Sequence, residues 1–423
     1  MKKYIREYGV LVRNSSFMRI IIAGFISSLG SKISYFALLR KVYEISNGKI
    51  TDLGFLSMFE IIPFIIFGGI AGTIIDKVSR KKVMVISDAL SGFVTLSVMW
   101  INNIYFIYLM AFMASTVYAF REPAQSAFEP NLVDKEDIAL LNSFKASMGS
   151  ITQIIGSAFG AAVVGFVGFK DAFIIDAISF WCSAFIIFTI IIKETHIIKV
   201  NTANEKGHFK EFIDGISIMY KNNSIRLMIL IDLFLTFAMS MQGMLIYIFI
   251  RQTLKMGDKA EMAWGWLLSS LGVGAMLGSL VIGIVVKRYK NKFKLFLNVL
   301  LFDAACFTAF LLNTFFPLSV VLFAFLGCIG TVHSIVLNTV LQDTVPDENR
   351  GKVFSAFGML RGPISILSIA VGTAAASVLS AQIVLLMAAF IELLIGVGVR
   401  FTKAYKEVED SIEVEVCQGI DNF

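Results

Sequence analysis

Long apolar runs alternate with short polar stretches along almost the whole chain. Each run has about 20 residues, the length that an α-helix needs to cross a bilayer. The pattern therefore predicts an all-α polytopic membrane protein with twelve transmembrane helices. The expected segments are 17–43, 53–75, 83–101, 104–120, 141–167, 170–192, 225–250, 262–286, 294–313, 317–341, 354–379 and 381–401.

A polar stretch, Lys193–Asn223, divides these segments into six and six. We expect an N-terminal six-helix bundle at 1–192, a cytoplasmic linker at 193–223, a C-terminal bundle at 224–403 and an acidic disordered tail at 404–423. Apolar residues of the linker recur at helical spacing, which predicts an amphipathic helix on the cytoplasmic membrane face. These residues are Phe209, Phe212, Ile213, Ile216, Met219 and Tyr220.

The two halves also repeat. Val133-Asp-Lys-Glu136, followed by Ser143, corresponds to Val345-Pro-Asp-Glu348, followed by Ser355, half a chain later. This repeat implies two pseudo-symmetric six-helix bundles related by an axis along the membrane normal, with a binding site between them near the midplane.

Composition supports a membrane protein and argues against a nucleic-acid-binding one. Hydrophobic residues make up 57% of the chain, charged residues 16%, and the mean hydropathy is +0.78. The formal net charge is +6, but the basic residues lie in short loops between apolar runs. Most of the 37 Lys and Arg residues fall on one side, which predicts a multi-pass protein of the plasma (inner) membrane with both termini cytoplasmic.

No cofactor or metal site is expected. The four cysteines have no spacing typical of a disulfide framework or a metal site. The sequence has no Gly-x-x-x-x-Gly-Lys-Ser/Thr motif, so it does not encode an ATP-driven pump on its own. Neither paired carboxylates nor a Ser/His/Asp set is legible at helical spacing, which argues against an enzyme.

A basic loop follows the second apolar run. Asp76, Lys77, Arg80 and further cations fall within a few residues, and Gly72 precedes them. Asp76 at a helix C-terminus is unfavourable for the helix dipole unless a cation or another helix N-terminus answers it. Gly68, Gly69 and Gly72 would let a neighbouring helix come close. The loop is either a gating latch or a basic hairpin that only sets topology.

Gly72-x-x-x-Asp76-Lys77-x-Ser79-Arg80-Lys81 resembles the signature loop between helices 2 and 3 of the major facilitator superfamily, with Ser79 in place of the usual Gly. The resemblance implies the major facilitator fold and a gating role for Asp76 and Arg80 in an interhelical charge relay. We expect Asp88, near the start of helix 3, to join this cluster.

Further segments resemble the branch that contains macrolide-efflux and enterobactin-export proteins. They include Glu122–Val133, Ile155–Gly160, Ile175–Phe180, Gln342–Pro346 and Arg350–Phe354. Two departures from the family pattern weaken the expectation of a standard proton-driven exporter. The segment Ala114–Phe120 lacks the usual Arg of helix 4, with Arg121 expected at the helix end. The helix 5 motif is reduced to Gly156-Ser157-Ala-Phe-Gly160-Ala161, whose small residues still permit close packing.

Charged residues inside apolar runs are costly and need a partner or a function. Lys32 in helix 1 and Glu60 in helix 2 both fall in the outer half of the membrane. They would form either a static pair bracing two helices or a cavity-lining pair that opens during transport.

Asp232 and Arg361 fall in the inner thirds of helices 7 and 11. Asp232 could take up a proton, because burial disfavours its charged form, or form an inner-gate hydrogen bond without titrating. Arg361 is expected either as its counter-charge or as a ligand for an anionic group.

Other polar residues within the runs have weaker assignments. His333 could exchange a proton or be a hydrogen-bonded packing residue. Gln153 and Gln242 could bind substrate or join helices. Support roles are expected for Asp176, Asp303 and Glu392.

Together these features predict a monomeric secondary transporter that exports a small amphipathic or apolar molecule, of a drug, macrolide or siderophore-like kind, by alternating access. Protons and membrane lipids are its other expected partners, with proton entry driving export. The alternatives are a nutrient symporter or facilitator and a transport-inactive receptor on the same fold.

Overall fold

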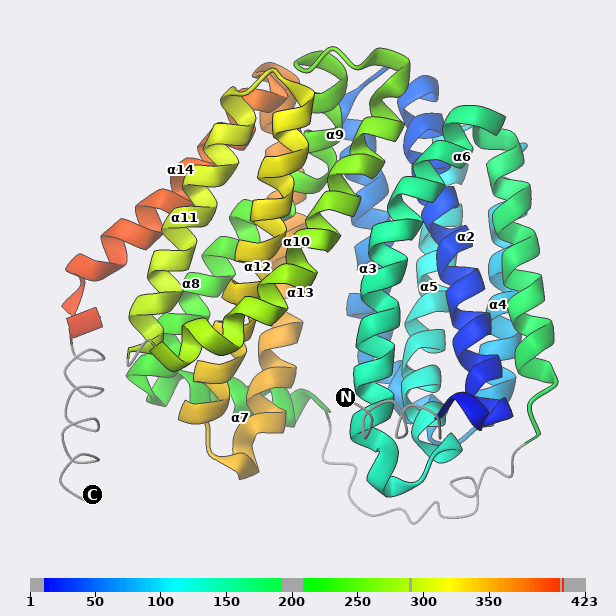
Figure 1. The fold of residues 1–423 in the computed structure, drawn as a ribbon, viewed down its shortest axis with the longest axis horizontal. Coiled ribbons are helices and arrows are strands. Elements are labelled where there is room, and N and C mark those ends of the chain that lie inside the picture. The colour runs from blue at the N-terminus through cyan, green and yellow to red at the C-terminus, as the bar shows by residue number, and fades with distance from the viewer. Residues whose placement is uncertain (1–10, 192–207, 289–290, 404, 407–423) are drawn as a thin grey trace. The chain divides into compact units, whose positions relative to one another are not determined.

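The computed structural model describes residues 11–191, 208–288, 291–403 and 405–406. Within these residues the chain is helical and contains no β-strand. The α-helices are α2 (Ser15–Ile45), α3 (Ile50–Ile75), α4 (Arg80–Val98), α5 (Ile104–Phe128), α6 (Ile138–Phe188), α7 (His208–Lys221), α8 (Asn223–Ser240), α9 (Gln242–Gln252), α10 (Ala260–Arg288), α11 (Lys292–Leu312), α12 (Phe316–Thr344), α13 (Asp347–Val378) and α14 (Ala381–Gly398) (Figure 1). Short 3₁₀ turns lie at Glu129–Leu132, Lys135–Asp137, Gly257–Lys259 and Val399–Phe401.

Each of the twelve expected segments corresponds to a helix. Ten helical segments of the described chain are long and apolar enough to cross a membrane. One of them, α6, holds two expected segments and is broken at Gly168, whose φ of 82° is a conformation that favours glycine. The expected third segment is α4, whose Arg80, Lys81, Lys82 and Asp88 lower its hydropathy. The expected segment 225–250 is divided at Met241 into α8 and α9.

Polar residues between the apolar runs begin the helices. A side-chain oxygen of an Asn or Ser accepts hydrogen bonds from backbone N–H groups of the first helical turn, which would otherwise lack a partner. The capping residues are Asn14 for α2, Ser79 for α4, Asn103 for α5, Asn222 for α8, Asn291 for α11 and Ser380 for α14. Ser79 therefore has a local structural role at the position where the family usually has Gly.

The chain forms two compact units. Unit 1 comprises Met1–Ala203 with Asp258–Ser269, and unit 2 comprises Asn204–Gly257 with Ser270–Phe423. Helices α2 to α6 belong to unit 1, and α7 to α9 and α11 to α14 to unit 2. The boundaries of the expected linker stay a prediction, because residues 192–207 lie outside the described residues.

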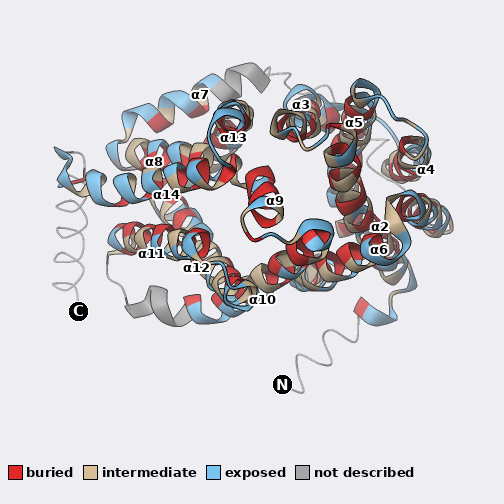
Figure 2. Cartoon of the chain, turned by 90° about the horizontal axis from the view of Figure 1, so that it is seen from above, coloured by how far each residue is buried: buried red, intermediate tan, exposed pale blue. Residues whose placement is uncertain are grey.

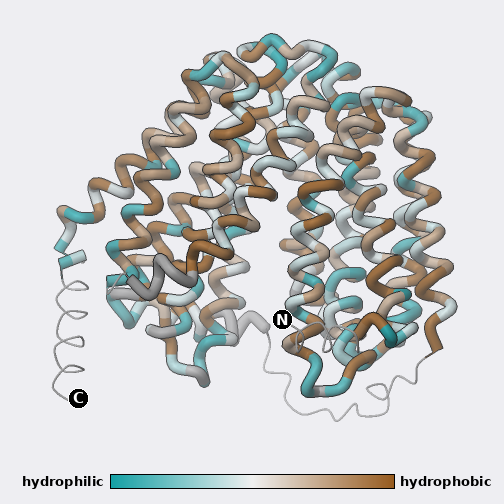
Figure 3. The backbone as a smooth tube through the Cα atoms, viewed as in Figure 1, coloured by the Kyte–Doolittle hydropathy of each residue, from teal (hydrophilic) through white to brown (hydrophobic). Residues whose placement is uncertain are grey.

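The surface of the helices is apolar. Large hydrophobic side chains such as Phe93, Phe106, Phe185, Leu280 and Phe390 are more than half exposed. In Figure 3 apolar positions run along the helices while polar positions gather near their ends, and Figure 2 marks the exposed positions on the outer sides of the helices. A helix surface of this kind is stable only in lipid, so the protein is a multi-pass membrane protein.

Small residues bring α2 and α6 together in unit 1 (Figure 1). A Cβ atom added at Gly160 would lie 2.9 Å from the backbone carbonyl carbon of Lys32, and one at Gly30 would lie 2.0 Å from Ser179 Oγ. Ser157 and Ala161 lie on an adjoining side of α6 and are completely buried, where an added Cβ at Gly265 of α10 would be 2.3 Å from Ala161 Cβ. The close packing expected from Gly156–Ala161 is thus confirmed, and it is the geometry by which small residues join helices in a membrane.

The amphipathic helix expected in the linker is α7, although the side chains of Phe209 and Phe212 lie outside the described residues. Gly215 packs against α13, where an added Cβ would be 2.5 Å from the Lys352 carbonyl oxygen, and Met219 is buried. Ile213, Ile216 and Tyr220 remain exposed. Contact of this apolar face with the membrane stays a prediction.

The described residues of the expected tail are Tyr405 and Lys406, and both are helical. Tyr405 is buried, and its ring centroid lies 5.7 Å from that of Phe293 on α11. The acidic residues from 407 onward lie outside the described residues.

We predict that Gly160→Ala lowers the thermal midpoint of unfolding, measured on purified protein in detergent. The new methyl group would meet backbone atoms of α2 that cannot move aside, and overpacking of this kind costs about 1–3 kcal/mol. Gly149→Ala on the same helix is the matched control, because a Cβ there meets nothing within 4 Å. It should leave the midpoint unchanged or raise it by removing backbone entropy, and equal effects of the two changes would contradict the packing argument.

Candidate functional site

The basic loop after α3 has the ion pair expected for it. Arg80 Nη2 lies 3.3 Å from Asp76 Oδ1, so a cation answers the acid at the C-terminus of α3. The Asp76 side chain is 73% exposed, whereas that of Arg80 is 14% exposed. Lys77 is also exposed. Asp76 is therefore held by a loose pair with Arg80 across the loop and is accessible to another partner.

Arg80 and Lys81 also donate hydrogen bonds to carbonyl groups at the C-terminal ends of neighbouring helices. Arg80 Nη1 donates to the Ala127 carbonyl of α5 at 2.8 Å, and Lys81 Nζ donates to the carbonyls of Phe188 and Ile190 after α6, each at 2.7 Å. Two cations in the first turn of α4 oppose its helix dipole, but they stabilise the negative ends of two neighbouring helices. The loop thus ties α4 to α5 and α6.

The glycines before the loop have no close neighbour within unit 1. A Cβ added at Gly68 or Gly72 would meet nothing within 4 Å. The close helix approach expected there is not formed within this unit.

Asp88 does not join the Asp76–Arg80 cluster, and this expectation was wrong. Asp88 lies about two turns into α4, is completely buried and accepts hydrogen bonds from Nε and Nη2 of Arg121. Ser183 of α6 donates to the same carboxylate at 2.6 Å. Asp88 is therefore the counter-charge of a buried arginine on α5.

Arg121 was also misplaced by the sequence. It does not lie at the helix end, because α5 continues to Phe128. The apolar run stops at Arg121 and Glu122, and the counter-charge that makes a buried arginine tolerable there, Asp88, is distant in the sequence. The sequence contained a signal for this pair, because Asp88 lies in one apolar run and Arg121 at the edge of the next.

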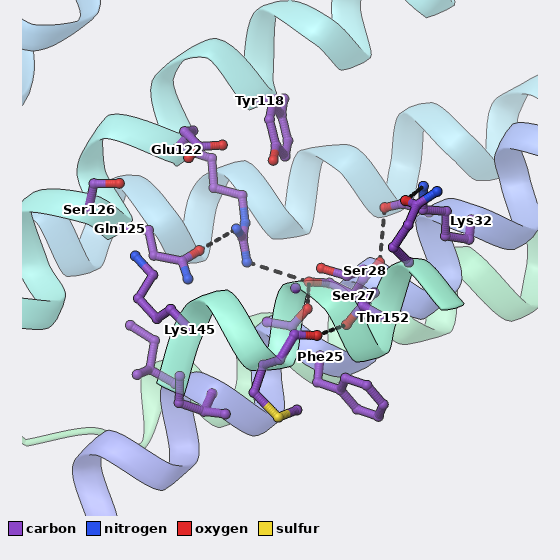
Figure 4. A pocket seen from close by; sticks show the side chains of 18 of the residues that line it. Phe25, Ser27, Ser28, Lys32, Tyr118, Glu122, Gln125, Ser126, Lys145 and Thr152 are labelled. Carbon is purple, nitrogen blue, oxygen red and sulfur yellow. Dashed lines mark hydrogen bonds between the residues drawn. The ribbon is translucent and has the colours of Figure 1, made fainter. Parts of the chain in front are cut away.

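A chain of polar contacts extends from Arg121 along a cavity in unit 1. Arg121 Nη1 donates to Gln125 at 2.6 Å, Gln125 donates to Glu129 at 2.5 Å, and Glu129 forms an ion pair with Lys145 of α6. Figure 4 shows the side chains of Gln125 and Lys145 at this cavity. Lys145 and Glu129 had not been recognised as site residues. The cavity has a volume of about 320 Å³ and is lined by α2, α5 and α6.

Lys32 projects from α2 into the same cavity and does not pair with Glu60. Its Nζ donates to Gln153 Oε1 of α6 at 2.8 Å. Among the described residues no carboxylate oxygen lies within 4 Å of this ammonium group. Its aliphatic stem crosses Gly156, where an added Cβ would be 3.2 Å from Lys32 Cγ. The expected Lys32–Glu60 contact is not formed, and Gln153 both joins two helices and lines the cavity.

Glu60 lies in a second cavity of unit 1, with a volume of about 360 Å³. Tyr35, Asp176 and Phe64 are among its other lining residues. Asp176 is buried beside Gly30 and accepts a hydrogen bond from Ser179. Because Asp176 also lines this cavity, its supporting role stays a prediction. No ion pair of Glu60 is present among the described residues. The two charges that were expected to meet are thus in separate cavities.

In unit 2 the expected pair of Asp232 and Arg361 is confirmed. Arg361 Nε and Nη2 donate to the two carboxylate oxygens of Asp232 at 2.8 and 2.6 Å, an arrangement that fixes both side chains. Asp232 is 3% exposed and Arg361 43% exposed. His333 lies within electrostatic range of both, and its ring centroid is 4.6 Å from that of Phe296. These residues form a second charged cluster.

Gln242 acts as a bridge between helices in this structure. Its Nε2 donates to Glu392 Oε1 of α14 at 2.9 Å. Asp303 of α11 is the nearby acid that interacts with Glu392. These contacts favour the structural reading of Gln242, Asp303 and Glu392 over a role in binding substrate.

The described part of the chain contains no group of three His, Cys, Asp or Glu side chains that could hold a metal ion. Cys182, Cys306 and Cys328 are free thiols. The polar side chains that line the two cavities are cations, acids, amides and hydroxyls, which can bind a polar or charged solute.

We predict that Asp88→Asn and Arg121→Gln each lower the free energy of unfolding by about 3–5 kcal/mol, because each leaves one buried charge without its partner. The double variant should cost much less than the sum of the two changes. Chemical denaturation of the purified protein in bicelles gives the coupling energy. Asp76→Asn is the control, since the Asp76 side chain is 73% exposed and an ion pair with an exposed carboxylate contributes less than about 1 kcal/mol. Additive losses at positions 88 and 121 would contradict the pairing.

Comparison with known proteins agrees with this architecture. The chain is 23% identical over 363 residues to the multidrug efflux pump Tap of Mycolicibacterium fortuitum, covering 82% of this chain and 87% of Tap. It is 22% identical over 356 residues to macrolide efflux protein A of Streptococcus pyogenes, covering 82% and 85% of the two chains. These relatives confirm the similarity to macrolide-efflux proteins.

The fold is also that of solved transporters. The crystal structure of the nucleoside transporter NupG superposes with a TM-score of 0.71 at 15% identity, covering 91% of this chain and 97% of NupG. Residues 20–369 match the sequence pattern of the Major Facilitator Superfamily. The protein therefore belongs to the Major Facilitator Superfamily and is a membrane transporter of that fold.

Proposed function

We propose that this transporter exports a small amphipathic or apolar molecule by alternating access and couples export to proton entry. The observation that carries the proposal is Glu60, an acid in the membrane-spanning part of α3 that lines a cavity without a cation within 4 Å among the described residues. A carboxyl group that is costly to keep charged in a membrane helix is suited to take up and release a proton. The names of the relatives Tap and macrolide efflux protein A support export as the direction.

Glu60 differs from Asp232 in having no cation partner. Arg361 donates hydrogen bonds to both carboxylate oxygens of Asp232, whereas no cation of the described residues lies within 4 Å of the Glu60 carboxylate. We therefore assign the primary coupling role to Glu60, and to the Asp232–Arg361–His333 cluster a conformational step that breaks its ion pair.

Asp76 and Arg80 are proposed to gate the cytoplasmic side. The exposed Asp76 carboxylate has a weak i,i+4 partner, whereas Arg80 and Lys81 anchor the loop to α5 and α6. Such a loop presents a positioned but available acid, which can bind a further partner when the transporter changes state. This role, the cytoplasmic location of both termini and a monomeric state are parts of the proposal.

We predict that Glu60→Gln abolishes efflux driven by a proton gradient while leaving the protein inserted and folded. Vesicles containing the purified transporter would be loaded with members of a drug, macrolide and siderophore panel, with and without an uncoupler. Glu44→Gln is the matched control, because Glu44 is a partly exposed acid in the last turn of α2 that pairs with Arg40. Wild-type efflux by Glu60→Gln would remove the coupling role, and proton-driven accumulation in the opposite direction would identify an importer.

A further inference from the structure

Most of the charged residues that line the unit 1 cavity around Lys32 are cations. Arg121 and Lys145 both line it, but their partners Asp88 and Glu129 do not. Those two carboxylates are completely buried behind the cations. Each ion pair therefore presents its positive end to the cavity.

Lys32 adds a charge that no acid balances. Its ammonium group donates to the neutral amide of Gln153, and no carboxylate of the described residues lies within 4 Å of it. Glu122 is the one acid among the lining residues, and in Figure 4 it lies beside Tyr118, away from Lys32. Three cations and one acid thus face the same space, which favours a negatively charged occupant.

The cavity also offers neutral hydrogen-bonding groups. The hydroxyl of Ser28 and the amide of Gln153 line it, whereas the hydroxyls of Ser31 and Thr152 already donate to carbonyl groups of their own helices. Ile20, Phe25, Met148 and Phe180 supply apolar walls. A site with a few polar groups on apolar walls is typical of small-molecule pockets and suits a ligand with an apolar body and one charged end.

We propose that this cavity binds the anionic group, a carboxylate or a similar oxyanion, of an amphipathic organic acid, with Lys32 as its principal ligand. This inference deepens the proposed function, on which it rests, because it makes the transported molecule an organic anion. Lys32 gives up its hydrogen bond to Gln153 or shares it with the ligand, and Arg121 and Lys145 add positive potential from the walls. The stem of Lys32 lies across Gly156, so the ammonium group is positioned before the ligand arrives.

The test uses thiol modification to measure the local potential in the full-length protein, with Cys182, Cys306, Cys328 and Cys417 replaced by Ser. Ser28 is exposed and lies one helical turn from Lys32 on α2. S28C should react faster with anionic sulfonatoethyl methanethiosulfonate than with the cationic trimethylammonioethyl reagent. Lys32→Gln should lower the ratio of the two rates at least about tenfold, and Lys32→Arg should keep it high.

The second cavity provides a matched control. Phe64 lies one turn from Glu60 on α3 and lines that cavity, so F64C should prefer the cationic reagent, and Glu60→Gln should remove the preference. If the ratio of anionic to cationic modification rates at S28C is the same with and without Lys32→Gln, the proposal is overturned. Failure of both reagents to modify S28C would also overturn it, since the cavity would then be closed to charged solutes.

Binding is measured in the same assay. Salicylate should slow modification of S28C, and salicylamide, which has the same ring but no charge, should not; Lys32→Gln should abolish the protection. No protection by salicylate would show that the cavity does not hold an organic anion.

The assay is repeated in nanodiscs of phosphatidylcholine with and without phosphatidylglycerol. Loss of salicylate protection on adding phosphatidylglycerol would assign the site to a lipid phosphate and overturn the substrate class proposed here. If Lys32-dependent protection is found but the vesicles described above show no export, the anion site stands and the proposed function fails.

Discussion

The arrangement of the helices depends on the free-energy cost of placing an unpaired charged side chain in a membrane helix. In unit 1 this cost is met by pairing residues from different helices, as Asp88 of α4 pairs with Arg121 of α5 and Glu129 pairs with Lys145 of α6. Lys41 of α2 is almost completely buried and donates to the backbone carbonyls of Val98 and Met99 at the end of α4. These polar contacts determine which helices adjoin, because lipid gives no hydrophobic preference between one apolar helix surface and another.

The buried pairs have a common polarity. Asp88 and Glu129 lie behind Arg121 and Lys145, and in unit 2 Asp232 lies behind the more exposed Arg361. A carboxylate accepts hydrogen bonds in a compact space, as Asp88 does from Ser183, whereas Arg and Lys can extend from their backbone to an accessible surface. For Lys145 and Arg361, burial of the acid therefore leaves the cation as the group that a solute meets, whereas Arg121 is itself buried and only borders its cavity. This arrangement explains how nearly neutral clusters can present positive potential.

The helices could be predicted from the sequence because each crosses about 30 Å of hydrocarbon and must be apolar over that length. The same criterion failed at Arg121, where a charge within α5 ended the predicted segment although the helix continues to Phe128. The apolar length of a segment also does not show which charged side chains pair with one another. Asp232 and Arg361 were matched correctly, but Lys32 was matched to Glu60 by depth alone, and depth does not specify the direction in which a helix presents a side chain. In the structure Lys32 faces α6 and Gln153, because Gly156 and Gly160 let α6 pack directly on that part of α2.

The separation of Lys32 from Glu60 has a mechanistic consequence under the proposed function. Their cavities share Ser31, Tyr118 and Phe180 as lining residues, so the two charges lie on opposite sides of a common wall. Binding at one cavity can affect the other only if it favours a different arrangement of that wall. Tyr118 is suited to such a role, because its side chain borders both cavities and is partly exposed. An organic anion at Lys32 and a proton at Glu60 would then be coupled through the position of an aromatic side chain, without the two charged residues ever forming an ion pair.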